Sequence, residues 1–490
     1  MSPSFIIRVY LMMKKISVLI MSAFLLFGCG TDLFYSSFYI RNTDLKWMLS
    51  PSEQDNLNYK STPIGTGGFN FNSPSILATQ DNYILFLYER RNNNNTAIIG
   101  VDGVNKTEVY AAISKNAEIF TVPTQLIGNS TLESHGSPIG FVNNNSDVVV
   151  LASSGSGFGG SSTKMTSLIS KSISIPKSEY RYWTEWEDLD TNIFEPLLSE
   201  KYDRFYTSPD SGITLRNGTL ACIIDYKKST SSADSTGKAE GFAILYSTDG
   251  GTNWKIGAKT AYQNHRFAKI IAERKDGKLL IAATQNGVNY QSKGNLAWFL
   301  ADSLDGNISS FTANGLPEHN CGSTAGGRIK LAAYGYSKEA ILLTHSYPER
   351  ATVNENNAKN TVINVNALYV SFDEGSNWNM VTNIFYGLTK SIDINVTPNE
   401  EFYYYDTYDS MSSFRQSMRV LKDGTIATVA ENGGYVINNT SGKDVGFKLV
   451  YRRFSLNAIS GGKYRYEGLW LIIKVWYYKL SFLFLTRSSN

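Results

Sequence analysis

The sequence predicts an all-β protein, a six-bladed β-propeller, from a short pattern that recurs between about residues 61 and 458. The pattern is a turn rich in Asn, Asp or Gly followed by an apolar run of strong β-propensity, and it occurs six times. Successive turns lie roughly 60 to 85 residues apart, which suits four-stranded blades with long loops better than a solenoid repeat. No long stretch of helical periodicity interrupts the series.

Each copy is expected to be a hairpin turn that leads into a strand. The six copies are residues 80–87, 145–151, 216–223, 275–281, 337–343 and 422–428. In three of them a glycine follows Asn217, Asp276 or Asp423, and these are the residue pairs that tight hairpin turns favour.

The composition excludes several classes of protein. Hydrophobic residues make up 42% of the 490 residues and aromatic residues 13%, enough for a sizeable core. A formal charge of +3 without a basic stripe argues against nucleic acid as a partner. Three cysteines argue against a disulfide scaffold or a four-thiolate zinc site. No glycine-rich loop joins a strand to a helix, so we expect no nucleotide or redox cofactor. We also expect the protein to be a monomer.

The N-terminal segment has the features of a bacterial secretion signal. Two lysines precede a short apolar run over 16–27, which is too short to span a bilayer as an ordinary helix. Residues 26–29, Leu-Phe-Gly-Cys, resemble a lipobox, which implies that Cys29 is acylated and becomes the mature N-terminus. The alternative is a plain signal peptide with an incidental cysteine. Met13 directly precedes the lysines and is a candidate for the true start.

These features predict four segments. Residues 1–28 are a lipoprotein signal peptide, 29–60 a polar tether, 61–458 the propeller and 459–490 an atypical apolar tail. The tail carries Lys474 and Lys479 inside its apolar stretch, which makes a membrane span costly, and a frameshifted or read-through end fits equally well. We therefore expect an exported protein, lipid-anchored to a bacterial membrane or the cell surface.

A second motif lies between the predicted strands. Residues 247–254 and 371–378 share the form S-x-D-x-G-x-x-W, with Asp249 and Asp373 followed by Trp254 and Trp378. A weaker copy contains Asp305, and residues 114–116 are an eroded one. Asp and Ser cap the donors of a tight turn, Gly takes the left-handed position and Trp packs between strands, so we expect these residues to be structural. The motif resembles the Asp-box, or BNR repeat, of sialidase-type propellers.

Further stretches resemble the exo-sialidases (neuraminidases), and the resemblance covers nearly all of 61–458. The stretches are 71–77 with 85–91, 206–220, 316–323 with 342–350, and 422–433 with 453–456. The resemblance implies a retaining glycosidase that removes terminal sialic acids. In that family, three arginines bind the substrate carboxylate, a Tyr activated by a Glu is the nucleophile, and an Asp is the acid/base.

The family positions are mostly substituted in this chain. The first arginine falls on Asn72. The acid/base Asp falls in 92–96, which holds no carboxylate, and Asp102 is the nearest candidate. The activating Glu falls near Ala268 and Lys269, and the second arginine near Thr284 and Gln285.

The third arginine matches Arg350, whereas the nucleophile falls on Arg415, which cannot be deprotonated. Arg350, Arg415 and Arg91 are therefore candidate carboxylate-binding residues. The alternative for Arg350 and Arg415 is a salt bridge at the surface or between blades, and for Arg91 a pairing with Glu89 and loop groups. A shifted register would make Tyr408 the nucleophile.

The histidines and cysteines suggest no metal site. The four histidines, His135, His265, His319 and His345, lack metal-ligand spacing, so we expect loop or packing roles. Cys222 and Cys321 are able to pair in an exported protein, but Cys222 lies in an apolar strand and is better explained as a small buried hydrophobe.

Three functional hypotheses follow. The first is an exo-sialidase, with Tyr, Glu and Asp converging on the propeller axis. The second is a catalytically inactive lectin or adhesin on the same fold, which binds sialylated glycans or mucin through arginines and aromatic residues. The third is a structural propeller whose axis is filled by apolar or neutral side chains.

Overall fold

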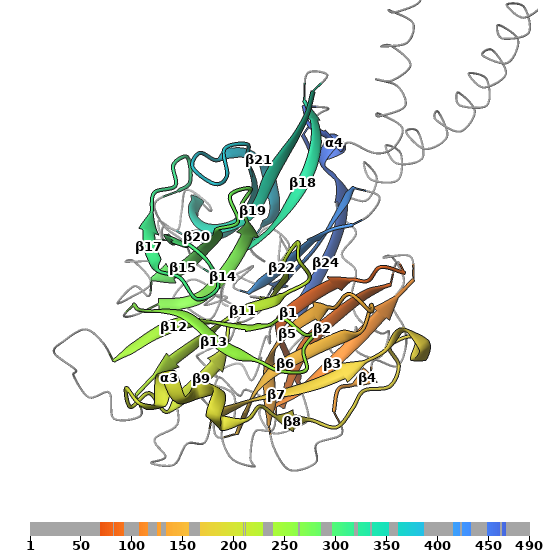
Figure 1. Ribbon diagram of the computed structural model, residues 1–490. Helices are drawn as coiled ribbons and strands as arrows, with labels where there is room; N and C mark the ends of the chain where they lie inside the picture. The colour runs from red at the N-terminus through yellow and green to blue at the C-terminus, as the bar shows by residue number, and fades with distance from the viewer. Residues whose placement is uncertain are drawn as a thin grey trace, which may run out of the picture.

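The computed structural model describes the chain between residues 69 and 466, with gaps (Figure 1). The positions outside the description within this range are 82, 93–106, 116–124, 129–133, 156–166, 209, 211, 229–238, 263–264, 286–295, 318–321, 334–335, 352–360, 387–414, 422–423, 433–447 and 461–462. The predicted signal peptide, tether and most of the apolar tail lie outside the described residues.

The described chain is almost entirely β-structure and forms six antiparallel blades, which confirms the predicted propeller. The first blade contains β1 (Phe69–Ala78), β2 (Ile84–Asn92), β3 (Thr107–Ser114) and β4 (Gln125–Leu126). The second contains β5 (His135–Val142), β6 (Val148–Gly155), β7 (Ser167–Ser174) and β8 (Glu187–Asp188). The third contains β9 (Arg204–Thr207), β10 (Ile213–Thr214), β11 (Leu220–Lys227), β12 (Glu240–Ser247) and β13 (Lys255–Ala261).

The remaining three blades follow the same plan. The fourth contains β14 (His265–Glu273), β15 (Leu279–Gln285), β16 (Leu296–Ala301) and β17 (Ile308–Phe311). The fifth contains β18 (Ala325–Ala333), β19 (Tyr336–Ala351), β20 (Thr361–Ser371) and β21 (Asn379–Tyr386), with β25 (Arg465–Tyr466) paired to β18. The sixth contains β22 (Gln416–Val420), β23 (Thr425–Asn432) and β24 (Lys448–Ser455).

Helices are short. They are the 3₁₀ turns η1 (Pro176–Ser178) and η2 (Thr191–Phe194) and the single α-helical turns α3 (Glu195–Leu198) and α4 (Leu456–Ile459). In the described part of the chain, no helix has the length and apolar character needed to cross a membrane. Packing continues past residue 458, because Tyr464 belongs to the core cluster between the fifth and sixth blades.

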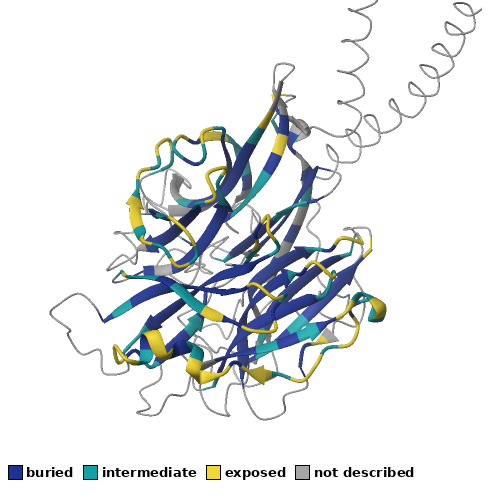
Figure 2. Cartoon of the chain, in the orientation of Figure 1, coloured by how far each residue is buried: buried dark blue, intermediate teal, exposed yellow. Residues whose placement is uncertain are grey.

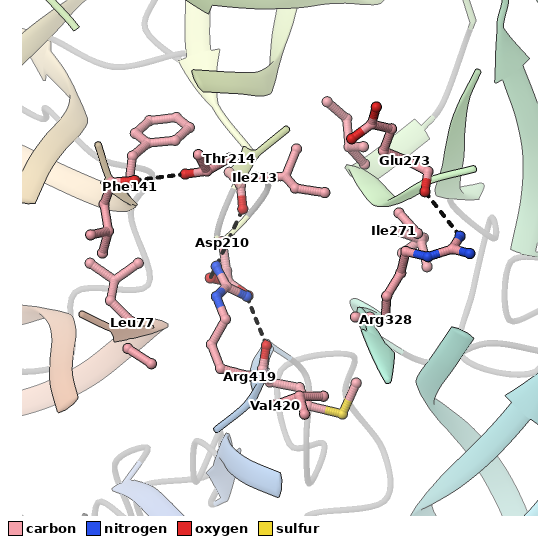
Figure 3. Close-up of a pocket in the computed structure, with 18 of the residues that line it drawn as sticks. Leu77, Phe141, Asp210, Ile213, Thr214, Ile271, Glu273, Arg328, Arg419 and Val420 are labelled. Carbon is pink, nitrogen blue, oxygen red and sulfur yellow. Dashed lines mark hydrogen bonds and ion pairs between the residues drawn. The ribbon is translucent and has the colours of Figure 1, made fainter. Parts of the chain in front are cut away.

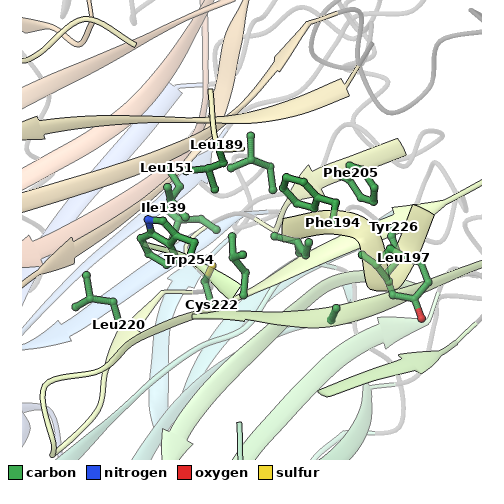
Figure 4. Close-up of a cluster of buried hydrophobic side chains, with 14 of the residues drawn as sticks. Ile139, Leu151, Leu189, Phe194, Leu197, Phe205, Leu220, Cys222, Tyr226 and Trp254 are labelled. Atoms are coloured by element: carbon green, nitrogen blue, oxygen red, sulfur yellow. The ribbon is translucent and has the colours of Figure 1, made fainter. Parts of the chain in front are cut away.

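The blades are held together by six apolar clusters, one between each pair of neighbours. Figure 4 shows the cluster between the second and third blades, where Cys222 and Trp254 pack against Ile139. The ring closes where Ile76 and Phe86 of the first blade meet Val429 of the sixth. Figure 2 shows the result, with buried strands and exposed residues confined mainly to turns and blade edges.

The innermost strands set a direction for the axis. We define its amino end as the end where β1, β5, β9, β14, β18 and β22 begin, and its carboxyl end as the end where they turn into the next strand. The repeated hairpin turns lie at the carboxyl end, where Gly218, Gly277 and Gly424 take positive φ angles of 88°, 83° and 79°. These are the glycines that follow Asn217, Asp276 and Asp423 in the sequence pattern.

The Asp-box turns lie at the same carboxyl end, because each one contacts the hairpin turn of the preceding blade. Asn143 Nδ2 donates to the Gly250 carbonyl at 3.1 Å, and the Lys275 amide donates to Glu374 Oε2 at 3.0 Å. The amino end of the axis is therefore free of Asp-box turns in the described chain.

Candidate functional site

The positions that the family resemblance selects gather at the amino end of the axis. Asn72 lies near the start of β1, and Arg415 directly precedes β22. Arg91, Gln285 and Arg350 are at or next to the last residues of β2, β15 and β19, which run towards the same end. Blade topology thus brings together residues that are hundreds of positions apart in the sequence.

The inner strands are bulged at this end. Three non-glycine residues on them have positive φ angles, Ser73 (51°), Ser137 (49°) and Phe267 (54°), and so does Asp210 (51°) between β9 and β10. In β1, β5 and β14 the strand register shifts at the same place. Such backbone costs on the order of 1–3 kcal/mol per residue and persists where surrounding contacts hold it, often at functional sites.

A buried carboxylate links the first three blades. Glu89 is fully buried, and its Oε2 accepts a hydrogen bond from the Ser137 amide at 2.8 Å. Ser137 Oγ lies 2.5 Å from the Tyr206 hydroxyl and 3.4 Å from Ser73 Oγ. Arg90, which follows Glu89 on β2, pairs with Glu108 at 2.9 Å.

An ion pair joins the third and fourth blades. His265 Nε2 lies 2.9 Å from Asp225 Oδ1, and its Nδ1 lies 2.5 Å from the Tyr262 carbonyl. Both neighbours are acceptors, so the geometry matches a protonated ring that donates from both nitrogens. Burial alone would lower the pKa of His265, but the Asp225 carboxylate outweighs it and the pKa is raised.

Arg415 and Gln416 connect the last three blades. The Arg415 guanidinium lies 5.6 Å from the centre of the Phe267 ring, a cation–π distance. The Gln416 amide donates to Ser323 Oγ at 2.9 Å, and its side chain is hydrogen-bonded to the Ser323 carbonyl and to Asn366. The backbone that carries Arg415 is therefore held on both sides of the axis.

The position where the resemblance predicts the activating glutamate, near Ala268 and Lys269, holds no carboxylate. Ala268 is buried in the cluster between the third and fourth blades, and Lys269 turns inward. Lys269 Nζ donates to the Gln416 carbonyl at 2.8 Å and lies 3.9 Å from Asp210 Oδ2. Asp210 also accepts from Ser75 Oγ at 2.8 Å and from Arg419 Nη2 at 3.1 Å. An ammonium in this position cannot act as a general base for a neighbouring tyrosine.

Several predicted residues fall outside the described part. Cys29, Asp102, Tyr408, His319 and Cys321 are not among the described residues, and for Arg91 and Arg350 only the backbone is described. Cys222 is a buried free thiol, and burial raises its pKa, so it is chemically inert. Within the described ranges, no three His, Cys, Asp or Glu side chains gather as a metal site would require.

The Asp-box carboxylates cap their own turns. Asp249 Oδ1 accepts from the Ser247 hydroxyl at 2.8 Å and from the Asn253 amide at 2.9 Å. Asp373 makes the same two bonds with Ser371 and Asn377, at 2.8 and 2.9 Å. Partial burial opposes ionisation, but these hydrogen bonds prevail and lower the pKa of both carboxyls. Asp305 instead accepts from the Tyr246 hydroxyl of the third blade at 2.9 Å.

The tryptophans of both motifs are buried. Trp254 is 3% exposed and its indole Nε1 donates to the Gly251 carbonyl at 3.0 Å. Trp378 is equally buried and stacks on Trp298 of the fourth blade, with ring centres 5.6 Å apart. The two motifs therefore fasten blades to each other and lie at the end of the axis opposite to the candidate site.

Sequence reasoning did not select Glu89, Asp225, His265 or Gln416 as site residues. A signal for two of them was present, because Glu89 and Asp225 each come directly after a run of apolar residues or close to the end of one in their strands. A carboxylate in such a strand requires a buried partner, which points to a functional or structural network.

This chain matches one family of known proteins in sequence and several solved structures in fold. The BNR repeat-like domain matches residues 74–360. No curated protein matches the sequence. Among solved structures, a Hadza microbial sialidase is similar with a TM-score of 0.54 and 13% identity, over 79% of this chain and 66% of the sialidase.

Two further solved structures are similar. A mutant Trypanosoma rangeli sialidase displaying trans-sialidase activity has a TM-score of 0.51 and 14% identity, over 85% of this chain and 59% of that one. A protein of unknown function from Dyadobacter fermentans has a TM-score of 0.51 and 11% identity, over 81% of this chain and 98% of that one. This chain thus spans less than two thirds of either sialidase, and the likeness establishes the sialidase-type propeller fold.

Proposed function

Because the chain belongs to the BNR repeat-like family and has a sialidase-type propeller, we propose that it binds terminal sialic acid of glycoconjugates without hydrolysing it. The site is the amino end of the axis. The protein acts as a lectin for sialylated glycans or mucin, using the family's pocket with a reduced set of arginines.

The main support for this proposal is the identity and the surroundings of Lys269. It occupies the place of the carboxylate that would activate a tyrosine, and its side chain is 2% exposed and engaged with Gln416 and Asp210. The nucleophile position holds Arg415, and the first arginine is replaced by Asn72. Loss of the base and the nucleophile removes turnover, whereas Arg350 and Arg415 retain the planar forks that pair with a carboxylate.

The surroundings also favour binding. Tyr206, Phe267 and the Arg415 guanidinium supply a ring, an apolar face and a cation beside the axis. Glu89 and the Asp225–His265 pair hold the neighbouring strands by buried hydrogen bonds, so little ordering remains to be done when a ligand arrives.

The test is proton NMR of the purified full chain with 3′-sialyllactose. We expect saturation transfer to sialyllactose within minutes, no transfer to lactose and no release of sialic acid over hours. Arg415→Gln should weaken binding about ten- to hundredfold, because a hydrogen bond to a charged group contributes about 1.5–3 kcal/mol. Arg350→Gln should do the same.

Arg181→Gln is the matched control, because Arg181 is exposed and pairs with Glu179 at the edge of the second blade. Release of sialic acid would overturn the lectin proposal and favour hydrolysis, with Tyr408 and Asp102 as the first residues to replace. Absence of both signals would leave the structural role as the remaining reading.

We also propose that the protein is exported and anchored through Cys29. The support is the lysine-led apolar run and the Leu-Phe-Gly-Cys sequence that ends at Cys29. Mass spectrometry of the mature N-terminus tests the anchor: a diacylglyceryl-modified cysteine is expected, and an unmodified N-terminus elsewhere in the chain would contradict it.

A further inference from the structure

A cavity lies towards the carboxyl end of the axis, away from the candidate sialic acid site. Its volume is about 450 Å³, within the range of small-molecule sites. The inner strands of all six blades contribute to its wall, from Leu77 on β1 to Val420 on β22. Figure 3 shows these side chains around the opening.

The wall is largely apolar. Leu77 and Phe141 lie on one side of the cavity in Figure 3, and Ile271 lies on the other. Ile213, Met418 and Val420 add further apolar surface. A ligand with many hydroxyl groups would lose hydrogen bonds to water against these side chains, so the body of a matching ligand is apolar.

The charged side chains of the wall are mostly positive. Four cations and two carboxylates are found among the described residues that line the cavity: Arg216, Lys269, Arg328 and Arg419, against Asp210 and Glu273. Arg328 is matched from outside by Glu374, with both guanidinium nitrogens 2.9 Å from its oxygens. Glu339 also accepts from Arg328 Nη2 at 2.9 Å, and Arg216, Lys269 and Arg419 remain on the wall with Asp210 and Glu273.

Two of those cations share the Asp210 carboxylate. Arg419 Nη2 lies 3.1 Å from Asp210 Oδ1, and Lys269 Nζ lies 3.9 Å from Oδ2. Asp210 and Lys269 side chains are 1% and 2% exposed, so water screens this cluster weakly. At the rim, Arg216 is half-exposed, with its Nη1 4.0 Å from Glu273 Oε1 and its Nη2 donating to the Glu273 carbonyl at 3.3 Å.

We infer that this cavity binds a small carboxylate with an apolar body. The ligand's carboxylate supplies the additional negative charge beside Arg419 and Arg216, and its apolar part lies between Leu77, Phe141 and Ile271. The site lies towards the other end of the axis from the one proposed for sialic acid, and Lys269 and Asp210 border both.

One position allows the cavity to be filled without backbone strain. A Cβ atom added to Gly327 would meet a single atom within 4 Å, a methyl of Val420 at 3.8 Å, and Gly327 is outside the positive-φ region. A larger side chain there enters the cavity. By contrast, a Cβ on the adjacent Gly326 would lie 2.4 Å from Ile271.

The experiment measures binding of hexanoate and phenylacetate to the full chain by isothermal titration and saturation-transfer NMR. Hexanamide and phenylacetamide are the neutral probes. We expect at least one acid to bind, its amide to bind at least tenfold more weakly, and Gly327→Leu to lower the affinity for the acid at least tenfold. Lys330→Leu, on an exposed position of the same strand, is the matched control and should bind as the parent does.

Three results would overturn the inference: no binding of either acid at 10 mM, equal binding of acid and amide, or unchanged binding by a folded Gly327→Leu variant. Arg415→Gln separates this inference from the proposed function, because it should lose sialyllactose and keep the acid. Loss of the acid in a folded Arg415→Gln variant would place the acid at the amino end and contradict the second site.

Discussion

The two ends of the propeller axis hold their polar groups in different ways. At the amino end, Glu89, His265 and Gln416 are buried and their hydrogen bonds cross from blade to blade. At the carboxyl end, Arg216 is half-exposed with a loose ion pair, and a cavity remains between the inner strands. The comparison suggests that the amino end is rigid before any ligand binds, whereas the carboxyl end has space and accessible charge.

Asp210 separates the two ends, and its replacement should have the largest effect. Asp210→Asn keeps the shape and tolerates the positive φ of 51°, but leaves Lys269 and Arg419 without their shared carboxylate. Breaking a buried ion pair costs about 3–5 kcal/mol, so we expect a loss of that size in the free energy of unfolding, measured with urea.

Asp302→Asn is the control for Asp210→Asn, since Asp302 pairs with Lys278 at an exposed site and should change little. Equal effects of the two variants would mean that Asp210 does not organise the axis.

The amino-end ion pair should give an intermediate effect that depends on pH. The pKa of His265 is raised in the folded chain, so its stabilisation is fully present below the unfolded pKa of about 6.5 and is lost as pH rises through the folded value. Asp225→Asn should therefore cost about 3 kcal/mol near pH 6 and progressively less at higher pH. Urea unfolding of both proteins from pH 6 to 9 measures this difference, and a constant difference would contradict the charged pair.

The contribution of His345 to the free energy of unfolding depends on pH in the opposite direction. It is fully buried, and burial lowers its pKa to about 3, so the folded chain loses stability as pH falls below about 6.5. The His345 contribution is common to the parent and to Asp225→Asn, and it cancels in their difference.

The smallest effect is expected at the rim of the carboxyl-end cavity. Arg216→Gln removes a half-exposed guanidinium that lies 4.0 Å from Glu273. Such pairs contribute little, so the free energy of unfolding should change by no more than about 0.5 kcal/mol. A loss near that of Asp210→Asn would show that the two ends do not differ in the way described.

The sequence predicted those features that depend on neighbouring residues. The hairpin turns were visible because Gly218 and Gly277 supply the positive φ that the turn needs. The Asp-box motifs were visible because Asp249 and Asp373 bond residues within four positions of themselves. Interactions between residues this close in the chain produce short motifs that can be recognised in the sequence.

The axis could not be predicted in the same detail, because its contacts join distant blades. Asp225 meets His265 across 40 residues, and Lys269 meets Gln416 across 147. The bulges at Ser73 and Ser137 follow no rule of strand periodicity, although Pro74 and Pro138 come directly after them. The cavity at the carboxyl end is lined by residues from the inner strands of six blades and has no motif of its own.

Closure of the ring has a consequence for the order of folding. The Ile76 amide donates to Ser417 Oγ at 2.8 Å, a contact between residues 341 positions apart. During synthesis the first blade is therefore made before the sixth blade that packs against it. Until then, Ile76 and Phe86 lack the apolar contacts that the sixth blade provides. Contacts of such long sequence separation form slowly and leave apolar surface exposed to aggregation in the meantime. A chain that ends before Gln416 lacks the sixth blade and cannot close the propeller ring. Completion of folding therefore depends on the last strands.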